Sequence, residues 1–145
     1  MFLTWLEEIL QNHILLTSVI AWATAETTKA FIRFCKPGKK SFRSLWGSGG
    51  MPSAHSATVS SLATSVGLFH GFNAYPFAIA SVFALVVMYD ACGVRLAASK
   101  HAKAINNMAE HQHKPLRESL GHTHLQVLAG FTLGVLVAFC AYLII

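Results

Sequence analysis

Charged residues are scarce in this sequence of 145 residues. They make up 12% of the chain, against 54% hydrophobic residues, and the mean hydropathy is +0.50. Soluble domains usually carry about 25% charged residues. This scarcity excludes an ordinary soluble domain and makes a lipid bilayer the natural solvent. The chain is also too short to hold several membrane spans and a separate soluble domain.

Cysteine and amino-terminal positive charge are also scarce. The three cysteines, Cys35, Cys92 and Cys140, are odd in number and widely spaced in or beside apolar runs. This pattern offers neither a disulfide framework nor a zinc spacing, and we interpret them as small buried apolar residues. The amino terminus begins without positive charge and carries Glu7 and Glu8, so we expect no cleavable signal peptide.

Four apolar segments are bounded by polar residues, glycine or proline. They cover residues 12–34, 53–72, 75–94 and 123–145. Each is close to the roughly 20 residues that cross a bilayer as a helix. The connection at 71–74 is very short, so the second and third segments are expected to form an antiparallel hairpin.

A further helix is expected in the last long connection. Residues 99–112 have helix-forming content, with Ala102, Ile105 and Met108 three residues apart, which is typical of an amphipathic helix at the membrane interface. The sequence therefore predicts an all-α integral membrane bundle of about four transmembrane helices plus a short interfacial helix. We expect a single transmembrane domain over residues 1–145.

Positive charge is confined to one predicted face. The two long connections, 35–52 and 95–122, share a face by chain parity, and all eleven Lys and Arg residues lie there or at the adjoining helix ends. These are Lys29, Arg33, Lys36, Lys39, Lys40, Arg43, Arg95, Lys100, Lys103, Lys114 and Arg117. The positive-inside rule makes that face cytoplasmic, with both termini outside. A phosphate-binding site would concentrate the same charges, which is the other interpretation.

The strongest local motif is a glycine turn leading into an apolar helix, GGMPSAHS, from Gly49 to Ser56. Glycine allows close approach of a ligand to the backbone, and the free N–H groups of a helix start favour an anion. His55 would then project beside that anion. The alternative is an ordinary Ser53 N-cap with a nearby polar histidine.

Two further groups of polar residues flank the apolar helices. Lys29 and Lys36 bracket the end of the first helix and could hold a phosphate between them. Lysine snorkelling, or an ion pair of Lys29 with Glu26, is the alternative. His122 and Gln126 are four residues apart at the start of the last helix, which favours an imidazole and an amide on one helical face.

Asp90 is an acidic residue inside the third apolar run, with Arg95 at its end. An acidic residue within a span is a functional candidate because leaving it unpaired is costly. A salt bridge to Arg95 or Lys29 is the structural alternative.

These motifs, taken in order, resemble a known signature. They are Lys29-x6-Lys36-Pro37, Pro52-Ser53-x-His55 and Arg117-x4-His122-x3-Gln126. They look like the three-part signature of the type-2 phosphatidic acid phosphatase and vanadium haloperoxidase superfamily. The runs GGMPSAHSA, YDACGVR and LGHTHLQV more closely resemble its small divergent membrane branch, and the resemblance covers most of residues 29–134.

The resemblance implies a metal-independent phosphatase without cofactors that forms a phosphohistidine. In this chain His122 would be the nucleophile and His55 the acid that protonates the leaving oxygen. The phosphate would be held by Lys29, Lys36, Ser53 and Arg117, and Arg95 and Gln126 complete the residues expected to bind substrate. Phosphoryl transfer asks for such cations around the phosphate oxygens, together with an in-line nucleophile and acid.

The chain departs from the family pattern at three points. Lys36 stands where the pattern has arginine, and Arg117 is one residue closer to His122 than usual. Arg95 and His101 do have the usual spacing, so His101 is a rival nucleophile. Gln126 replaces an acid that would orient the histidine. Either Asp90 takes over this role, or the enzyme is slow or inactive.

The resulting prediction is a membrane lipid-phosphate phosphatase. Candidate substrates are a phosphatidic acid, a phosphatidylglycerol phosphate or an isoprenyl diphosphate, at the cytoplasmic face of a bacterial inner membrane. The expected partners are this phosphorylated lipid and membrane lipids, with no nucleic acid, and a homo-oligomer is left open. The rivals are a non-catalytic protein that binds anionic lipids, and a metal site built from Glu110, His111, His113, His122 and His124.

Overall fold

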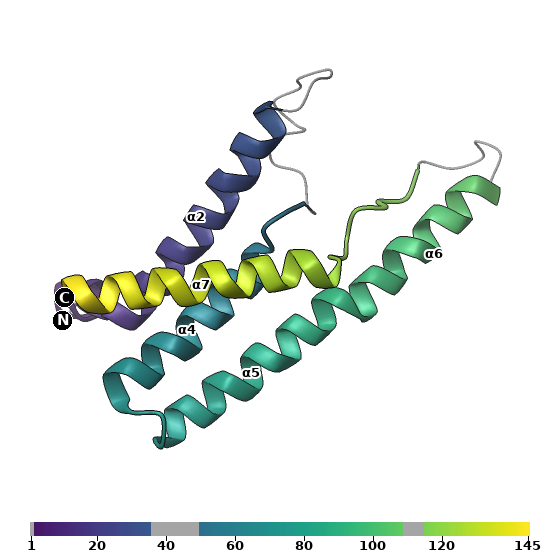
Figure 1. The fold of residues 1–145 in the computed structure, drawn as a ribbon. Helices are drawn as coiled ribbons and strands as arrows, with labels where there is room; N and C mark the ends of the chain where they lie inside the picture. Colours follow the sequence, from purple (N-terminus) through teal and green to yellow (C-terminus); the bar gives the residue numbers. More distant parts are fainter. Residues whose placement is uncertain (1, 36–49, 109–114) are drawn as a thin grey trace.

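The computed structural model describes residues 2–35, 50–108 and 115–145, and every regular element in these ranges is an α-helix. In chain order the helices are α1 (Phe2–Leu10), α2 (His13–Cys35), α4 (Ala54–His70), α5 (Tyr75–Cys92), α6 (Val94–Met108) and α7 (His124–Ile144). The two termini lie together at one end of the molecule (Figure 1). The all-helical prediction is therefore confirmed.

The helix boundaries differ from the prediction at two places. A short amino-terminal helix, α1, precedes α2 and was not predicted; Asn12 separates the two, because its Oδ1 accepts a hydrogen bond from the N–H of Leu15. Helix α6 begins at Val94 rather than near residue 99, and it continues almost directly from α5. Gly93 sustains this continuity, since its N–H donates to Tyr89 and its carbonyl accepts from Ala97.

Two stretches of the described residues are long and apolar enough to cross a membrane. They are Tyr75–Met108, which joins α5 and α6, and His124–Ile144. The length of α7, 21 residues, matches the roughly 20 residues that a bilayer requires.

The interior is built from small side chains, and the large apolar ones face outward. The largest fully buried side chains are Thr17, Ser53, Ser56, Ser60, Ser61 and Ser65. Leu143 and Ile79, by contrast, are 81% and 72% exposed. Small residues at helix contacts and bulky apolar residues outside are the pattern of helices packed in lipid. Cys35 and Cys140 are exposed as well, so the expectation that the cysteines are buried was wrong for these two.

Helix α4 is the centre of the bundle and packs against α2, α5 and α7. Its contact with α7 is the closest, because Gly130 and Gly134 present no side chain to it. A Cβ atom at Gly130 would overlap the carbonyl oxygen of Ser53, and one at Gly134 would overlap Ser60 Oγ and the carbonyl oxygen of Ala57. The Ser60 hydroxyl also donates to the Phe131 carbonyl at 3.1 Å. These contacts fix the register of the two helices.

Helix α2 meets the bundle through a stripe of residues spaced four apart. Thr17, Ala21, Ala25 and Lys29 are all buried, and residues at this spacing share one helical face. The stripe begins with small side chains and ends on a lysine. Packing of α2 against α4 therefore carries the Lys29 side chain into the interior.

Candidate active site

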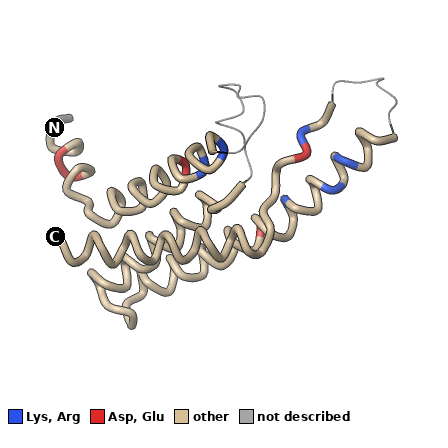
Figure 2. Tube along the Cα trace, turned by 45° about the horizontal axis from the view of Figure 1, so that its top comes forward, with Lys and Arg blue, Asp and Glu red and all other residues tan. Residues whose placement is uncertain are grey.

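The described basic residues gather at the end of the molecule opposite the termini (Figure 2). Lys29 and Arg33 come from α2, whereas Arg95, Lys100 and Lys103 come from α6. The acidic residues Glu7 and Glu8 of α1 lie at the other end, near the amino terminus. The end where α2 finishes and α4 and α7 begin thus holds the candidate site.

Ser53 places His55 at the start of α4. Its hydroxyl oxygen accepts a hydrogen bond from the Ser56 hydroxyl at 3.0 Å and one from the Ser56 N–H at 3.4 Å. Its own N–H donates to the Gln126 carbonyl at 3.0 Å. Ser53 is therefore the N-cap that the sequence offered as an alternative interpretation, and it ties the first turn of α4 to α7.

His122 is placed by an extended segment, residues 115–123, that lies along α6. The Ser99 hydroxyl accepts from the N–H groups of Leu120 and Gly121 at 2.9 and 3.0 Å. The His122 N–H donates to the Ala91 carbonyl at 3.0 Å. Gly121 is required here, because a Cβ atom would overlap the Leu96 backbone. The segment is thereby pressed onto the start of α6.

Asn106 holds the other end of this segment. Its side-chain Nδ2 donates to the Leu116 carbonyl at 2.9 Å, and its Oδ1 accepts from the Leu116 N–H at 2.8 Å. The amide therefore pairs with Leu116 as a neighbouring strand would. Together with Ser99, it fixes two points of the path that leads to His122.

His55 and His122 face each other across the site, although 67 positions separate them in the chain. Their ring centroids are 6.5 Å apart and the ring planes are nearly perpendicular, at 87°. His122 is only 5% exposed, and neither of its ring nitrogens has a hydrogen-bond partner among the described residues. A buried polar group without a partner is costly, so the His122 ring is suited to meet a ligand.

Two cations lie near this histidine pair. Lys29 is 5% exposed and its Nζ lies 2.5 Å from Glu26 Oε1. Arg95 Nε lies 2.5 Å from Asp90 Oδ2. The charges of both cations act on both rings. Burial, and then the positive charges of Lys29, His55 and Arg95, lower the pKa of His122 below its ordinary value of 6.5. The ring is therefore held neutral, which is the nucleophilic form.

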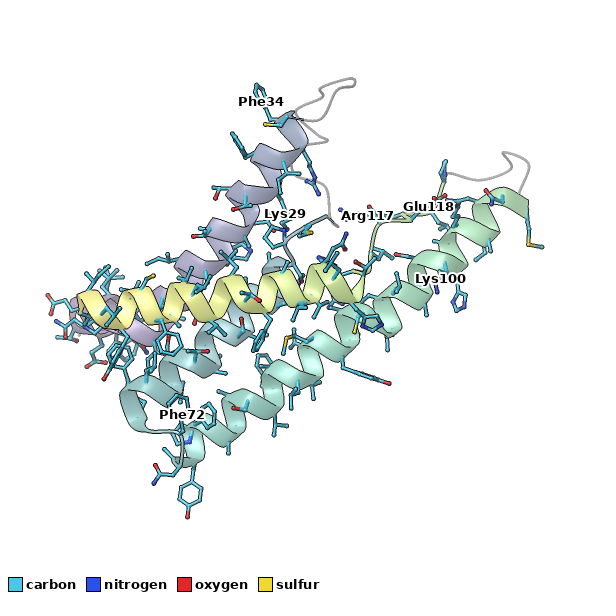
Figure 3. All side chains as sticks on the ribbon, in the orientation of Figure 1. Lys29, Phe34, Phe72, Lys100, Arg117 and Glu118 are labelled. Atoms are coloured by element: carbon cyan, nitrogen blue, oxygen red, sulfur yellow. The ribbon has the colours of Figure 1, made fainter. Side chains whose placement is uncertain are left out.

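Other predicted site residues lie farther out. Arg117 is exposed on the segment before α7, next to Glu118 (Figure 3). The rival nucleophile His101 is exposed on α6. Lys36 lies outside the described residues. The structure thus brings His55, His122, Lys29 and Arg95 together at the start of α4.

The expectation that His122 and Gln126 share a helical face was wrong. Helix α7 begins at His124 with Thr123 as its N-cap, so His122 precedes the helix. The Gln126 side chain accepts from the Thr123 N–H at 3.1 Å, and the Thr123 hydroxyl accepts from the Gln126 N–H at 3.4 Å. This reciprocal pair is a capping box. Gln126 therefore caps its own helix rather than orienting His122.

Asp90 and Glu26 both form ion pairs that the sequence offered as structural alternatives. Asp90 pairs with Arg95, which is the structural alternative offered by the sequence. Glu26 pairs with Lys29 and lies beside the candidate site, yet it was not among the predicted site residues. Its position three residues before a lysine within an apolar helix was the available signal.

Arg33 was also absent from the predicted site. A Cβ atom at Gly50 would lie 3.4 Å from Arg33 Nη2 and 3.9 Å from Lys29 Cδ. Gly50 therefore lies directly against these two side chains. The signal in the sequence was the spacing of four residues between Lys29 and Arg33, which places them on one face of α2.

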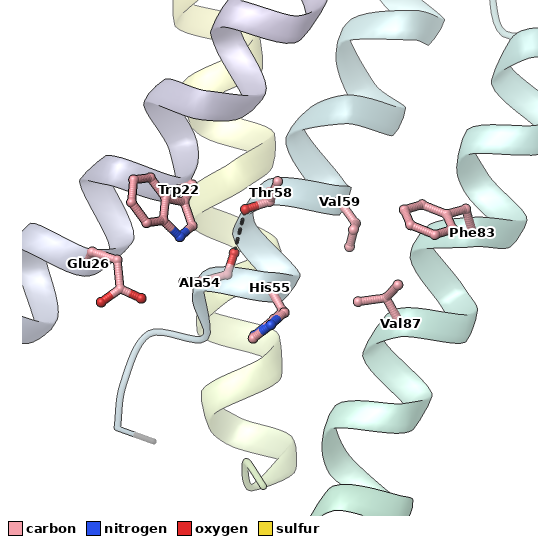
Figure 4. A pocket seen from close by; sticks show the side chains of 8 residues that line it. All are labelled: Trp22, Glu26, Ala54, His55, Thr58, Val59, Phe83 and Val87. Atoms are coloured by element: carbon pink, nitrogen blue, oxygen red, sulfur yellow. Dashed lines mark hydrogen bonds between the residues drawn. The ribbon is translucent and has the colours of Figure 1, made fainter. Parts of the chain in front are cut away.

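A pocket of about 360 Å³ extends from the candidate site between α2, α4 and α5 (Figure 4). It is lined by Trp22, Glu26, Ala54, His55, Thr58, Val59, Phe83 and Val87. Within the described residues, no group of three or more His, Cys, Asp or Glu side chains is placed to hold a metal ion. Of the proposed metal ligands, Glu110, His111 and His113 lie outside the described residues.

Comparison with known proteins identifies the family of this chain. Residues 10–137 match the divergent PAP2 family. The chain is also 34% identical, over 148 residues, to the uncharacterized membrane protein YuiD of Bacillus subtilis (strain 168), a similarity that covers 90% of this chain and 94% of that protein. No solved structure matches. With an all-helical bundle, small residues at its helix contacts and a family match over most of its length, the chain belongs to the divergent PAP2 family of membrane proteins.

Proposed function

We propose that this protein is a membrane phosphatase that hydrolyses phosphate esters of lipids through a phosphohistidine. The observation that carries the proposal is the pair of His55 and His122, with ring centroids 6.5 Å apart and with Lys29 and Arg95 acting on both rings. Phosphoryl transfer depends on an in-line nucleophile and acid, with positive charge around the phosphate oxygens. This site supplies each of these groups.

The proposed reaction has two steps. A ring nitrogen of neutral His122 attacks phosphorus, the bond from phosphorus to the lipid oxygen breaks, and protonated His55 gives its proton to that oxygen. Water then attacks the phosphohistidine, His55 takes a proton from this water, and inorganic phosphate leaves. The site returns to its starting protonation after each cycle.

Lys29 and Arg95 would stabilise the negative charge that builds up on the phosphate oxygens. Each is paired with a carboxylate in the structure, Glu26 and Asp90 respectively, which keeps the cations in place before the phosphate arrives. Ser53, Lys36, Arg117 and Gln126 remain proposed contacts to the substrate. Ser53 would donate its hydroxyl hydrogen and Gln126 its side-chain amide hydrogens, because their backbone N–H groups already donate to the Gln126 carbonyl and the Thr123 hydroxyl.

Four of the helices, α2, α4, α5 and α7, are proposed to cross a bacterial inner membrane with the basic end in the cytoplasm. The substrate would then be a newly made lipid such as a phosphatidic acid, a phosphatidylglycerol phosphate or an isoprenyl diphosphate. An impermeant thiol reagent tests this orientation in cysteine-free protein. Asn73→Cys should react in intact cells, and Lys103→Cys only after the membrane is opened.

The test of the function is release of inorganic phosphate from lipid phosphates by the purified protein in the presence of a chelator. Wild-type protein should release phosphate and be inhibited by vanadate, which resembles five-coordinate phosphorus. His122→Ala should abolish release while the protein stays folded, whereas His101→Ala should retain it. If phosphate release survives in His122→Ala and is lost in His101→Ala, the nucleophile is His101 and the assignment to His122 is wrong.

The second candidate is a protein that binds anionic lipids without turnover. It is favoured by the capping role of Gln126, because this side chain supplies no negative charge to a histidine. Such a protein would bind lipid phosphate, measured by flotation with vesicles, and release no phosphate from any of the three substrate classes.

A further inference from the structure

The pocket beside His55 has a polar level and an apolar level. Each of three helices contributes a pair of lining residues spaced four apart: Glu26 and Trp22 from α2, His55 and Val59 from α4, and Val87 and Phe83 from α5. Helix α4 also contributes a second such pair, Ala54 and Thr58. In Figure 4, Glu26, His55 and Val87 lie together at one level, and Trp22, Thr58, Val59 and Phe83 lie at the other. The Thr58 hydroxyl at this second level donates to the Ala54 carbonyl at 2.8 Å. Four helical residues span about 6 Å, so the pocket turns from polar to apolar within one helical turn.

The apolar level points away from the candidate site. Helix α2 runs from Trp22 toward Glu26 and Lys29, and α5 runs from Phe83 toward Val87 and Asp90. Trp22, Val59 and Phe83 are therefore farther from the charged groups and deeper along the helices. A ligand seated with its phosphate near His55 would extend its apolar part along this level.

The pocket is also open at the side. Within the described part of the chain, no Cα atom of α2 lies within 8 Å of a Cα atom of α5, although both helices pack against α4. The ribbon shows the two helices on opposite sides of α4 (Figure 1). Trp22 and Phe83, one on each wall, are 47% and 52% exposed. An opening between two helices gives direct access from the hydrocarbon of a bilayer.

We propose that this pocket, called the groove from here on, holds a hydrocarbon chain of the phosphorylated lipid. The lipid would enter sideways from the membrane, between α2 and α5. The proposal rests on the proposed function for the identity of the headgroup. Amphiphilic complementarity supports it, because the groove is apolar along one level and ends on His55, near Lys29 and Arg95, where a phosphate would be neutralised. Its volume, about 360 Å³, falls within the usual range of small-molecule sites.

Two neighbouring valines provide a matched pair of variants. Val87 lines the groove, whereas Val86 is 61% exposed and lines a separate hollow with Ile79 and Val82. The assay compares kcat/KM for a phosphatidic acid with two long acyl chains against kcat/KM for p-nitrophenyl phosphate, which has no chain. Val87→Trp should lower the ratio of these two values by about 10-fold or more, because the indole would occupy the groove. Val86→Trp should leave the ratio unchanged.

A second measurement uses the wild-type protein and does not depend on a variant that folds. A phosphatidic acid with a diazirine in its acyl chain should label Trp22 and Val59 on illumination, both of which line the groove. Excess unlabelled long-chain phosphatidic acid should prevent the labelling. Labelling confined to outward residues such as Ile79 and Val82 would overturn the proposal. So would an equal fall of the ratio in both valine variants, or a groove that stays unlabelled.

The two proposals can fail separately. Groove labelling in a protein that releases no phosphate would preserve the lipid groove and refute the phosphatase. Phosphate release that is equally efficient with and without acyl chains, together with no groove labelling, would preserve the phosphatase and refute the groove.

Discussion

The two sides of α4 are packed in opposite ways. Toward α7 the helix backbones meet at Gly130 and Gly134, where a single added carbon would overlap backbone or hydroxyl oxygens of α4. Toward the gap between α2 and α5, the side chains of α4 face an open pocket. One helix thus carries both the tightest contact of the described bundle and one wall of its groove.

The two sides of α4 therefore have different structural roles. The tight side fixes the start of α4 to the start of α7, through the hydrogen bond from the Ser53 N–H to the Gln126 carbonyl and through the two glycines. That register determines how the backbone at His55 stands relative to the segment that carries His122. The open side is left free for a ligand, and it can tolerate changes that the tight side cannot.

The largest expected effect comes from filling the tight side. Gly134→Ala should lower the unfolding temperature in detergent by about 10 °C, because overpacking costs about 1–3 kcal/mol, and Gly134→Val should yield no folded protein. Leu136→Ala is the control, since Leu136 lies on the same helix and is exposed. Equal unfolding temperatures for Gly134→Ala and wild type, measured by a fluorescence melt, would mean that this contact does not set the register.

The next effect concerns the ion pair of Arg95 and Asp90. Arg95→Ala should lower kcat/KM about 100-fold, because it removes a charge that stabilises the transferring phosphate. Asp90→Asn should have a smaller effect, and none when added to Arg95→Ala, if Asp90 acts only by holding Arg95 in place. A double variant that loses the product of the two single losses would show instead that Asp90 acts on the reaction independently of Arg95.

A moderate effect is expected on the pH dependence of stability. Burial and neighbouring positive charge hold the pKa of His122 below 6.5 in the folded protein, whereas the unfolded chain takes up a proton near 6.5. Protonation therefore favours the unfolded state, and stability is lost as pH falls from 6.5 through the folded pKa. Melting temperatures of the wild type should decline over this range more than those of His122→Asn. Parallel curves would contradict a lowered pKa.

The smallest effect is expected for Gln126→Glu. A glutamate can complete the same capping box and places negative charge at a helix start, where it is favourable. Unfolding temperature and kcat should both stay close to those of the wild type, with kcat changed less than about 3-fold. Repulsion between the new carboxylate and the substrate phosphate should appear as a higher KM. A gain in kcat of two orders of magnitude would show instead that the carboxylate orients His122.

Much of the fold could be predicted from the sequence because apolar runs and their boundaries are local. The second apolar segment, 53–72, corresponds to α4 within two residues, since Ser53 caps the helix and Gly71 ends it. The start of α7 could also have been predicted from neighbouring residues in the sequence. Thr123 and Gln126 have the spacing of a capping box, and recognising it would have placed His122 before the helix.

The remaining parts of the site depend on contacts between distant residues. No sequence pattern predicts that Asn106 pairs with Leu116 or that Ser99 pairs with Gly121. Both pairs nevertheless position the segment that ends at His122. The proximity of Arg33 to Gly50 likewise arises from packing of α2 against the start of α4. Such contacts follow from helix packing in three dimensions, which the order of residues along the chain does not specify.

The most direct test of the phosphatase proposal is to trap the covalent intermediate. Wild-type protein is mixed with a lipid phosphate, quenched in alkali within milliseconds to seconds, and digested for mass spectrometry, because a phosphohistidine survives base and is lost in acid. We predict a phosphate on His122, absent in His122→Ala and retained in His101→Ala. Phosphate found on His101, or release of inorganic phosphate without any phosphohistidine in the quenched protein, would contradict the proposed mechanism.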